Sequence, residues 1–221
     1  MVKIKRNVTA QHGSPPQKLL TAAPTPFFIE MSLELIIGPM FAGKSSAIIG
    51  TIRRNTFINR KTLCVTNTID TRYAAEAKIM THDMESYPAT AVDNLMELKL
   101  LSQYHNADCI IIEEAQFFTD LLDFVLYAVE VHNKHVICVG LDGDTQRKPF
   151  GQLLQLIPYA DDVKKYASLC SQCHDGTRGI FTSRKNGSYE KQISVGGAEQ
   201  YEPLCRKHFL AANQNLNKGG Q

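Results

Sequence analysis

The chain of 221 residues contains no tryptophan, and its net charge is only +2. A nucleic-acid-binding protein usually shows a strongly basic face, or aromatic side chains on which single-stranded bases stack, so both observations favour a chain with no nucleic-acid partner. No apolar run of roughly eighteen residues occurs, and the sequence therefore predicts no transmembrane helix and no membrane partner. With 43% apolar and 21% charged residues, the composition is that of an ordinary globular protein.

The first thirty residues lack a sustained apolar period, and no acidic residue precedes Glu30. They are rich in proline, threonine and alanine, and they contain no apolar segment long enough for a secretory signal. This composition predicts a disordered extension over residues 1–30, with Met31 as an alternative start. A basic start without acids is also typical of an organellar presequence, and that alternative stays open. Residues 211–221 are predicted to form a flexible tail.

The six cysteines do not form the even, loop-rich pattern of a disulfide-stabilised protein. A reducing compartment and a cytoplasmic location are therefore favoured. Cys64, Cys109 and Cys138 lie inside apolar runs and are predicted to be buried small hydrophobic residues. The other three cysteines lie close to one another or to a histidine, which indicates a different role.

Short apolar runs alternate with segments of helical spacing from residue 33 onward. Strands are predicted at 33–38, 62–67, 108–113, 135–141 and 162–169, and helices at 44–60, 93–105 and 120–133. Asn94 and Glu97 are spaced as a capping box for the second helix. Alternating strands and helices, with each strand a continuous apolar run, indicate an α/β fold whose parallel sheet is covered on both faces.

The segment GPMFAGKS at residues 38–45 fits the phosphate-loop pattern G-x-x-x-x-G-K-[ST], between a predicted strand and a predicted helix. Gly38 and Gly43 allow a backbone wrap whose N–H groups point at phosphate oxygens, next to the positive end of the helix. Lys44 can reach the β- and γ-phosphates, and the Ser45 hydroxyl can ligate Mg²⁺. The loop predicts binding of a nucleoside triphosphate. It leaves open a small-molecule kinase, an NTPase motor or switch, and an ATP-dependent nucleic-acid enzyme.

Two adjacent glutamates end the apolar run IIIEEAQFF at residues 110–118. Ligands of parallel sheets gather at the carboxyl ends of strands, so Glu113 is expected to face the Mg²⁺ shell. Successive strand residues point to opposite faces, and the strand is therefore expected to stop between the two glutamates. Glu114 would then be free to accept a proton from an acceptor hydroxyl. The alternative is a solvated strand end with two surface carboxylates.

The pairs CSQC (170–173) and CRKH (205–208) form a C-x₂-C…C-x₂-H pattern. Four such ligands suit a tetrahedral, structural Zn²⁺ site with no position left for water: Cys170, Cys173, Cys205 and His208. The stretch between the pairs, residues 179–197, carries an Asn-Gly turn at Asn186 and is predicted to form a hairpin. The metal would hold together a small second lobe over residues 170–210, which is too small to build its own core.

Together, GPMFAGKS, DTRY (70–73), EEAQFF (113–118), LDGDTQRKPFG (141–151), GGAEQY (196–201) and the two Cys/His pairs closely resemble one family. This family is the zinc-containing type II thymidine kinases of the cytosolic and poxvirus kind, and the resemblance covers roughly residues 31–210. It implies a RecA-like nucleotide-binding core over 31–169 and a zinc lobe with a lasso loop over 170–210. It also implies a homotetramer that transfers the γ-phosphoryl of ATP to the 5′-hydroxyl of thymidine or deoxyuridine, giving dTMP for nucleotide salvage.

The resemblance further implies the residues of the site. Glu114 would be the catalytic base, with Ser45 and Glu113 at the Mg²⁺ ion. The implied ATP contacts are Gly38, Pro39, Met40, Phe41, Ala42, Gly43, Lys44, Ser45, Asp70, Thr71, Arg72, Glu113, Glu114, Ala115 and Gln116. The implied nucleoside contacts are Met40, Phe117, Leu141, Thr145, Phe150, Thr182, Gln192, Ile193, Ser194, Val195, Gly196 and Tyr201. Without the resemblance, the burial habits of aromatic residues favour ordinary core packing for both phenylalanines.

The chain departs from the usual pattern of that family at a few positions. Glu113 stands where aspartate is usual, and its extra methylene bears on metal binding. Thr145 stands where phenylalanine is usual, which bears on the packing of the base. Gln192 and Ser194 replace apolar residues, and Ala115 replaces glycine. Thymidine kinase is the preferred interpretation over a nucleic-acid-stimulated ATPase with a zinc module and over a degenerate ATP-binding protein.

Overall fold

The structure, a computed structural model, describes residues 31–70, 78–80, 86–185 and 197–214. Its centre is a six-stranded sheet in the order β5-β2-β6-β7-β1-β8, and every neighbouring pair is parallel. These strands are β1 (Ser32–Ile37), β2 (Thr62–Asn67), β5 (Thr90–Val92), β6 (Cys109–Ile112), β7 (His135–Gly140) and β8 (Asp162–Lys165). The predicted α/β fold with a parallel sheet is therefore confirmed.

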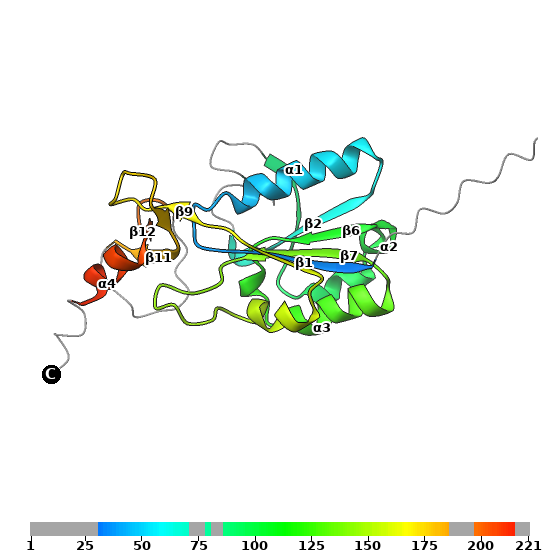
Figure 1. Cartoon of the computed structure of the whole chain (residues 1–221). Helices are drawn as coiled ribbons and strands as arrows, with labels where there is room; N and C mark the ends of the chain where they lie inside the picture. The colour runs from blue at the N-terminus through cyan, green and yellow to red at the C-terminus, as the bar shows by residue number, and fades with distance from the viewer. Residues whose placement is uncertain (1–30, 71–77, 81–85, 186–196, 215–221) are drawn as a thin grey trace, which may run out of the picture.

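Both faces of the sheet are covered, as the continuous apolar strands predict. Helix α1 (Lys44–Phe57) packs on one face, where Ile48 and Ile52 meet Ile111. Helix α3 (Leu121–Leu126) lies on the other face with Phe124 against the alternate strand positions, such as Ile110. Figure 1 shows α1 and α3 on opposite sides of the strands. Cys64, Cys109 and Cys138 are buried thiols in these clusters, as predicted.

The remaining elements of the core are short. They are η1 (Thr68–Asp70), the β3 (Lys78–Met80) and β4 (Ser86–Pro88) hairpin, η2 (Leu95–Leu100), α2 (Ser102–Asn106), η3 (Ala115–Phe117), η4 (Tyr127–Val131) and η5 (Leu153–Tyr159). Among helices in the described part of the chain, none combines the length and the apolar character needed to cross a membrane.

Several predicted boundaries differ from the structure. The helix predicted at 93–105 is wrong as a single element, because the chain is extended at Leu101 between η2 and α2. Leu95 and Leu98 are buried three residues apart, a spacing that matches the 3₁₀ repeat better than the α repeat. Asn94 does cap this segment, since its side chain accepts a hydrogen bond from the Met96 N–H. The predicted strand 108–113 stops at Ile112 in the sheet.

Two further elements end earlier than predicted. Helix α1 ends at Phe57 rather than at residue 60, because Asn59 adopts a left-handed φ of 57° that no helix interior contains. The predicted helix 120–133 is α3 followed by the π-helical turn η4. The run 162–169 splits into β8, which pairs with β1, and β9 (Ser168–Leu169), which belongs to a separate small sheet.

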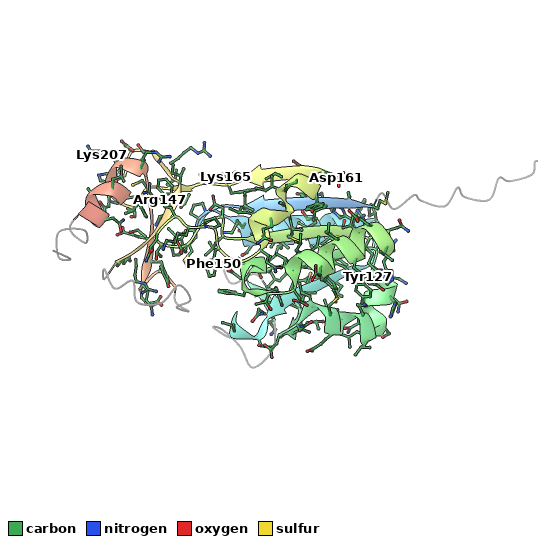
Figure 2. All side chains as sticks on the ribbon, turned by 90° about the horizontal axis from the view of Figure 1, so that it is seen from below. Tyr127, Arg147, Phe150, Asp161, Lys165 and Lys207 are labelled. Carbon is green, nitrogen blue, oxygen red and sulfur yellow. The ribbon has the colours of Figure 1, made fainter. Side chains whose placement is uncertain are left out.

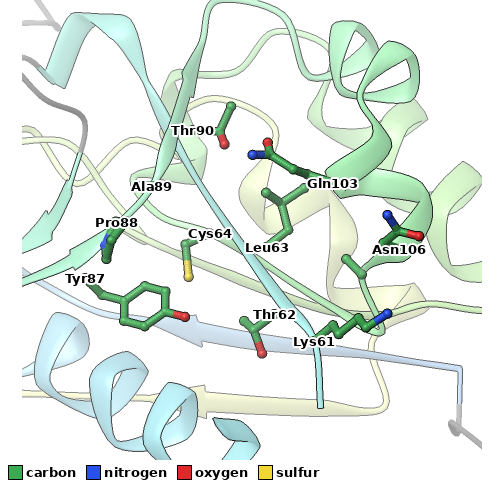
Figure 3. A pocket seen from close by; sticks show the side chains of 11 residues that line it. Lys61, Thr62, Leu63, Cys64, Tyr87, Pro88, Ala89, Thr90, Gln103 and Asn106 are labelled. Carbon is green, nitrogen blue, oxygen red and sulfur yellow. The ribbon is translucent and has the colours of Figure 1, made fainter. Parts of the chain in front are cut away.

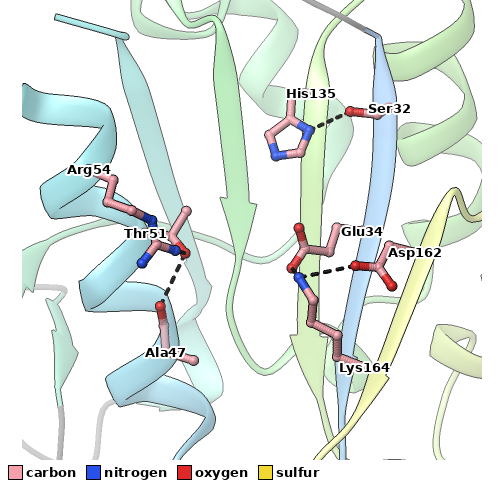
Figure 4. Close-up of polar contacts among 8 residues, drawn as sticks. All are labelled: Ser32, Glu34, Ala47, Thr51, Arg54, His135, Asp162 and Lys164. Atoms are coloured by element: carbon pink, nitrogen blue, oxygen red, sulfur yellow. Dashed lines mark hydrogen bonds and ion pairs between the residues drawn. The ribbon is translucent and has the colours of Figure 1, made fainter. Parts of the chain in front are cut away.

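Polar contacts join β1 to the strands on both of its sides (Figure 4). The Ser32 hydroxyl lies 2.6 Å from Nδ1 of His135 on β7. On the other side, Lys164 of β8 contacts Glu34 at 2.6 Å and Asp162 at 3.1 Å. Lys164 is 46% exposed, so each of these ion pairs contributes at most about 1 kcal/mol. The apolar clusters, rather than these pairs, stabilise the sheet.

The described part of the second lobe contains two small antiparallel sheets and one helix. Strand β9 pairs with β10 (Arg178–Gly179), β11 (Phe181–Arg184) pairs with β12 (Tyr201–Leu204), and α4 (Arg206–Gln214) follows. The first strand of the hairpin predicted over 179–197 is confirmed as β11. Its partner strand, β12, lies beyond the predicted range. The predicted turn at Asn186 lies outside the described residues.

A surface pocket of about 350 Å³ lies beside the first half of β2 (Figure 3). Its lining includes Lys61, Thr62, Tyr87, Gln103 and Asn106. Thr62 begins β2, so this pocket lies at the amino-terminal edge of the parallel sheet. Ligands of such sheets bind at the opposite edge, where the phosphate-loop motif follows β1. None of the predicted site residues lines the pocket.

Candidate active site

The phosphate-loop segment connects β1 to α1 at the carboxyl edge of the sheet. Gly38 has a φ of 150°, and a Cβ there would come within 2.6 Å of the Tyr166 carbonyl oxygen. Gly43 has a left-handed φ of 78° and is the N-cap of α1. Both predicted glycines therefore occupy positions that exclude a side chain or strain one. The first turn of α1 contains no acidic residue, which suits an anion at this helix end.

Lys44 folds back over the loop that precedes it. Its ammonium group donates hydrogen bonds to the carbonyl oxygens of Gly38 at 3.1 Å and Pro39 at 2.7 Å. Burial lowers the pKa of Lys44, while the carboxylates of Glu114, Asp142 and Glu113, in falling order of effect, oppose that shift. Lys44 therefore lies near three carboxylates. It also lies beside the loop at which a bound phosphate is expected.

Ser45 and Glu113 form a direct pair between α1 and the end of β6. The Ser45 hydroxyl donates a hydrogen bond to Glu113 Oε1 at 2.6 Å, and the Glu113 side chain is buried. The Glu113 N–H still donates to the Val65 carbonyl, so its backbone continues the direction of the strand. A hydroxyl and a carboxylate oxygen are the hard ligands that Mg²⁺ prefers, and this pair fits the ion.

Glu114 turns the chain away from the strand. Its φ of 50° and ψ of 42° lie in the left-handed region, which is uncommon for a residue with a side chain. The backbone of Glu114 therefore departs from the direction of the strand. The predicted stop between the two glutamates is wrong by one residue, because β6 ends at Ile112. Gln116 donates a hydrogen bond from Nε2 to Glu114 Oε2, and its Oε1 accepts one from the Leu141 N–H at 3.1 Å.

Two phenylalanines lie next to this turn. Phe117 on η3 and Phe150 after β7 contact each other edge to face, with ring centroids 5.6 Å apart and planes at 89°. Phe150 is buried and Phe117 is half-buried. The half-buried Leu141 directly follows β7, and the half-buried Thr145 lies in the same connection. The structure thus brings aromatic and apolar groups to the strand edge that also carries the phosphate loop.

The second lobe reaches the phosphate loop through Thr182 on β11. The Thr182 hydroxyl oxygen accepts a hydrogen bond from the Met40 N–H at 3.0 Å, and Thr182 is buried. Directly across the β11–β12 ladder, Arg184 donates to the hydroxyl of the buried Tyr201 at 3.2 Å. Three predicted nucleoside contacts, Met40, Thr182 and Tyr201, therefore belong to the loop and to the lobe strands that approach it.

Other predicted site residues fall outside the described part of the chain. They are Thr71, Arg72, Gln192, Ile193, Ser194, Val195 and Gly196, while only the backbone of Asp70 is described, as the last residue of η1. Among the remaining predicted ATP contacts, Phe41 and Ala42 lie in the loop, and Ala115 is buried directly after Glu114. The proposed roles of all these residues stay predictions.

Two polar residues in the connection after β7 were missed by sequence reasoning. Asp142 contributes to the charge around Lys44, and its Oδ2 accepts from Lys165 Nζ at 2.6 Å. The sequence could have indicated Asp142, because this residue directly follows the predicted strand 135–141 and so lies at the carboxyl edge of the sheet. Arg147 lies against the lobe, with its guanidinium 5.4 Å from the ring centre of Phe181 and 5.0 Å from that of Phe209 (Figure 2).

The four predicted zinc ligands converge in the lobe. The ligand atoms of Cys170, Cys173, Cys205 and His208 lie within 4.8 Å of one another. His208 Nδ1 is 3.3–3.5 Å from the three sulfurs, and Sγ of Cys173 is 3.8 Å from Sγ of Cys205. Zinc bond lengths of about 2.3 Å to sulfur and about 2.0 Å to nitrogen give tetrahedral edges of about 3.8 and 3.5 Å, so the cluster fits this ion.

Electrostatics also suit a metal at this cluster. Burial raises the pKa of the Cys170 thiol, but hydrogen bonds from the backbone of Cys205 and Gln172 and from His208 outweigh it and bring that pKa to about 6. A thiolate is the form of cysteine that binds zinc. With four protein ligands and no open position, such a site is structural rather than catalytic.

Comparison with known proteins identifies the family. The family model described as thymidine kinase matches residues 31–209. Thymidine kinase a of Arabidopsis thaliana is 38% identical over 182 residues, which cover 81% of this chain and 75% of that protein. The cytosolic thymidine kinase of Homo sapiens is 35% identical over 177 residues (79% and 71%), and the thymidine kinase of raccoon poxvirus is 35% identical over 178 residues (80% and 96%). The chain belongs to the thymidine kinase family.

Proposed function

We propose that the protein is an ATP-dependent thymidine kinase, which transfers the γ-phosphoryl of ATP to the 5′-hydroxyl of thymidine or deoxyuridine. One observation carries the proposal in this member of the family: a phosphate loop, a carboxylate at a turn and an aromatic pair share the carboxyl edge of one sheet. Binding of ATP alone would explain the loop. It would not explain an acceptor-side carboxylate beside aromatic rings.

The loop and its neighbours bind the triphosphate. Backbone N–H groups of the loop surround the phosphates, apart from Pro39, which has none, and Met40, which donates to Thr182. Lys44 exchanges its two carbonyl contacts for phosphate oxygens. Ser45 and Glu113 hold the Mg²⁺ ion, which neutralises phosphate charge when it is bound. We include Asp70, Thr71 and Arg72 in the ATP site, together with the segment 113–116, because the family pattern places them there.

Glu114 accepts the proton of the acceptor hydroxyl. As that O–H bond breaks, the 5′-oxygen forms a bond to the γ-phosphorus, and the bond from this phosphorus to the β–γ bridging oxygen breaks. The products are the nucleoside monophosphate and ADP, with the proton on the Glu114 carboxylate. Glu114 suits this role because it lies at a turn directly after β6, where its carbonyl oxygen accepts from the N–H of Phe117 in the aromatic pair.

The nucleoside occupies the space beside Phe117 and Phe150. A flat base is bound by aromatic faces and apolar walls, to which Met40, Leu141 and Thr145 contribute. Thr182, Tyr201 and the backbone of residues 192–196 complete the pocket from the lobe.

The zinc lobe has a structural role in this proposal. The core extends over 31–169, and the lobe, 170–210, supplies its part of the nucleoside pocket only when its four ligands are joined. A reducing compartment such as the cytoplasm keeps these thiols available, and the three core thiols are free as well. We further propose a homotetramer, by analogy with the zinc-containing thymidine kinases.

The assay combines labelled ATP and Mg²⁺ with thymidine, deoxyuridine, deoxycytidine or deoxyadenosine in separate reactions. Labelled monophosphate is expected with the first two nucleosides only. A parallel reaction contains single-stranded DNA and no nucleoside. Phosphate release that requires DNA, with no monophosphate formed from any nucleoside, would contradict the proposal and would favour a nucleic-acid-stimulated ATPase.

A further inference from the structure

Gln116 makes two directional hydrogen bonds and is almost fully buried. Its Oε1 accepts from the Leu141 N–H at 3.1 Å, and its Nε2 donates to Glu114 Oε2. A backbone N–H can only donate, so Leu141 fixes which end of the carboxamide faces it. The NH₂ group must then point at Glu114. With 3% of its surface exposed, the side chain has little freedom to turn away.

Two glycines make room for this residue. A Cβ at Gly140, the last residue of β7, would lie 2.2 Å from Gln116 Oε1 and 2.9 Å from Leu153. A Cβ at Gly151, whose φ is +60°, would lie 2.2 Å from the Gln116 carbonyl oxygen. Separate parts of the chain therefore leave space for the side chain and for the backbone of Gln116. Neither glycine belongs to the phosphate loop.

Glu114 needs such support because of where it lies. The residue occupies a left-handed turn directly after the strand and is only half-buried. A carboxylate on a half-exposed turn has several accessible rotamers, and only some of them present an oxygen to a bound hydroxyl. A fixed donor at Oε2 restricts that choice.

We propose that Gln116 is a positioning residue that orients the Glu114 carboxylate for proton transfer. Gly140 and Gly151 leave the space that Gln116 occupies. This inference rests on the proposed kinase activity and adds to it. It differs from a role for Gln116 as an ATP contact. An ATP contact would act on the affinity for ATP, whereas a positioning residue acts on the rate of transfer.

The test compares steady-state kinetics of Gln116→Glu with wild type. This change keeps the oxygen that faces Leu141 and replaces the donor at Glu114 by a repelling oxygen. Displacement of a catalytic group by about 1 Å can reduce a rate roughly 100-fold, so we expect kcat to fall about 10- to 100-fold and KM for ATP to change less than about threefold. Gln155→Glu, the same change at an exposed position on η5, is the matched control and should behave as wild type.

A double-mutant comparison identifies the partner through which Gln116 acts. In the Glu114→Gln background, Gln116→Glu should cost much less than in wild type. Gly140→Ala, which places a methyl group against the carboxamide, should lower kcat in the same way. If Gln116→Glu does not fold by circular dichroism, then Gln116→Met, which has a similar volume, and Gly140→Ala decide the question.

The possible results are distinct. A wild-type protein that forms no thymidine monophosphate overturns the proposed function and this inference with it. An active wild type with an unchanged kcat in the folded variants overturns the inference alone. A raised KM for ATP at unchanged kcat, or equal costs of Gln116→Glu with and without Glu114, also overturns it. A lower kcat that depends on Glu114 supports it.

Discussion

The core and the zinc lobe are stabilised in different ways. The core buries apolar side chains on both faces of the sheet, with Phe124 and Ile110 on one face and Ile52 and Ile111 on the other. The buried cluster of the lobe is Cys170, Leu204, Cys205 and Phe209, and two of these belong to the predicted zinc site. A small unit cannot bury enough apolar area to offset its loss of chain entropy. The core can therefore fold by burial, while we expect the lobe to depend on a metal ion at its Cys/His cluster.

The two regions meet at the phosphate loop. Thr182 of the lobe accepts from the Met40 N–H of the loop, and Arg147 of the core packs on Phe181 and Phe209 of the lobe. Phosphate chemistry belongs to the core in our proposal, and half of the nucleoside pocket belongs to the lobe. We therefore expect a metal in the lobe to affect function at a distance, through the position of lobe strands β11 and β12.

Removal of zinc should have the largest effect. Zinc binding supplies about 10–16 kcal/mol in small zinc-dependent peptides, so the lobe should unfold when a chelator removes the ion, while the core stays folded. Hydrogen exchange followed by mass spectrometry should show lost protection in 168–184 and 201–209. Protection of β1, β6 and β7 should remain.

The control for this prediction is a cysteine that is not a ligand. Cys138→Ala should retain one zinc per chain and normal protection of the lobe, whereas Cys173→Ala should lose both. Unchanged protection of the lobe after verified zinc removal would mean that the small cluster around Leu204 and Phe209 is sufficient by itself. The contrast between the two regions would then be wrong.

The same contrast explains what could be predicted from sequence. The phosphate loop and the zinc pairs are local patterns, in which neighbouring residues carry the chemistry, and both were placed correctly on the chain. Alternation along the strand predicted a stop at the glutamate pair, and β6 ends one residue earlier than predicted, at Ile112. These features depend on spacing along the sequence, which a reader of the sequence sees directly.

Contacts between distant segments were not predictable. Met40 and Thr182 are 142 residues apart, and nothing near either residue indicates that a hydroxyl will accept from that N–H. The pairing of Gln116 with Leu141 and the fit against Gly140 likewise require the three-dimensional register of β6 and β7. The 3₁₀ segment η2 was missed because the difference between a period of 3.0 and one of 3.6 is small over six residues.

Loss of the proposed base should have the next largest effect. Glu114→Gln keeps the size of the side chain and an oxygen for Gln116, but it removes proton acceptance. General-base catalysis contributes about 10²–10⁴-fold, so kcat should fall by that factor while the affinity for a fluorescent ATP analogue changes little. Zinc content and melting temperature should equal those of wild type, because the change lies in the core site.

Glu130→Gln, at an exposed position, is the control for Glu114→Gln. Full activity of the Glu114 variant would exclude it as the base and would return the two glutamates to a structural role. A loss of ATP affinity equal to the loss of kcat would instead place Glu114 in ground-state binding of the nucleotide. Either result would weaken the assignment of proton transfer to the core.

The smallest expected effect concerns the link between the two regions. Thr182→Val removes the acceptor of the Met40 N–H at nearly constant volume, whereas Thr182→Ser keeps it. A neutral hydrogen bond contributes about 1 kcal/mol, which predicts about fivefold weaker binding of an ATP analogue by the valine variant, measured without nucleoside. This hydrogen bond would then be the contact through which the lobe positions the phosphate loop. In that case zinc-free wild type should bind the ATP analogue as weakly as zinc-bound Thr182→Val. Removal of zinc from Thr182→Val should not weaken its binding further. Equal affinities of zinc-bound wild type, Thr182→Val and Thr182→Ser for the ATP analogue would mean that the core forms its phosphate site independently of the lobe.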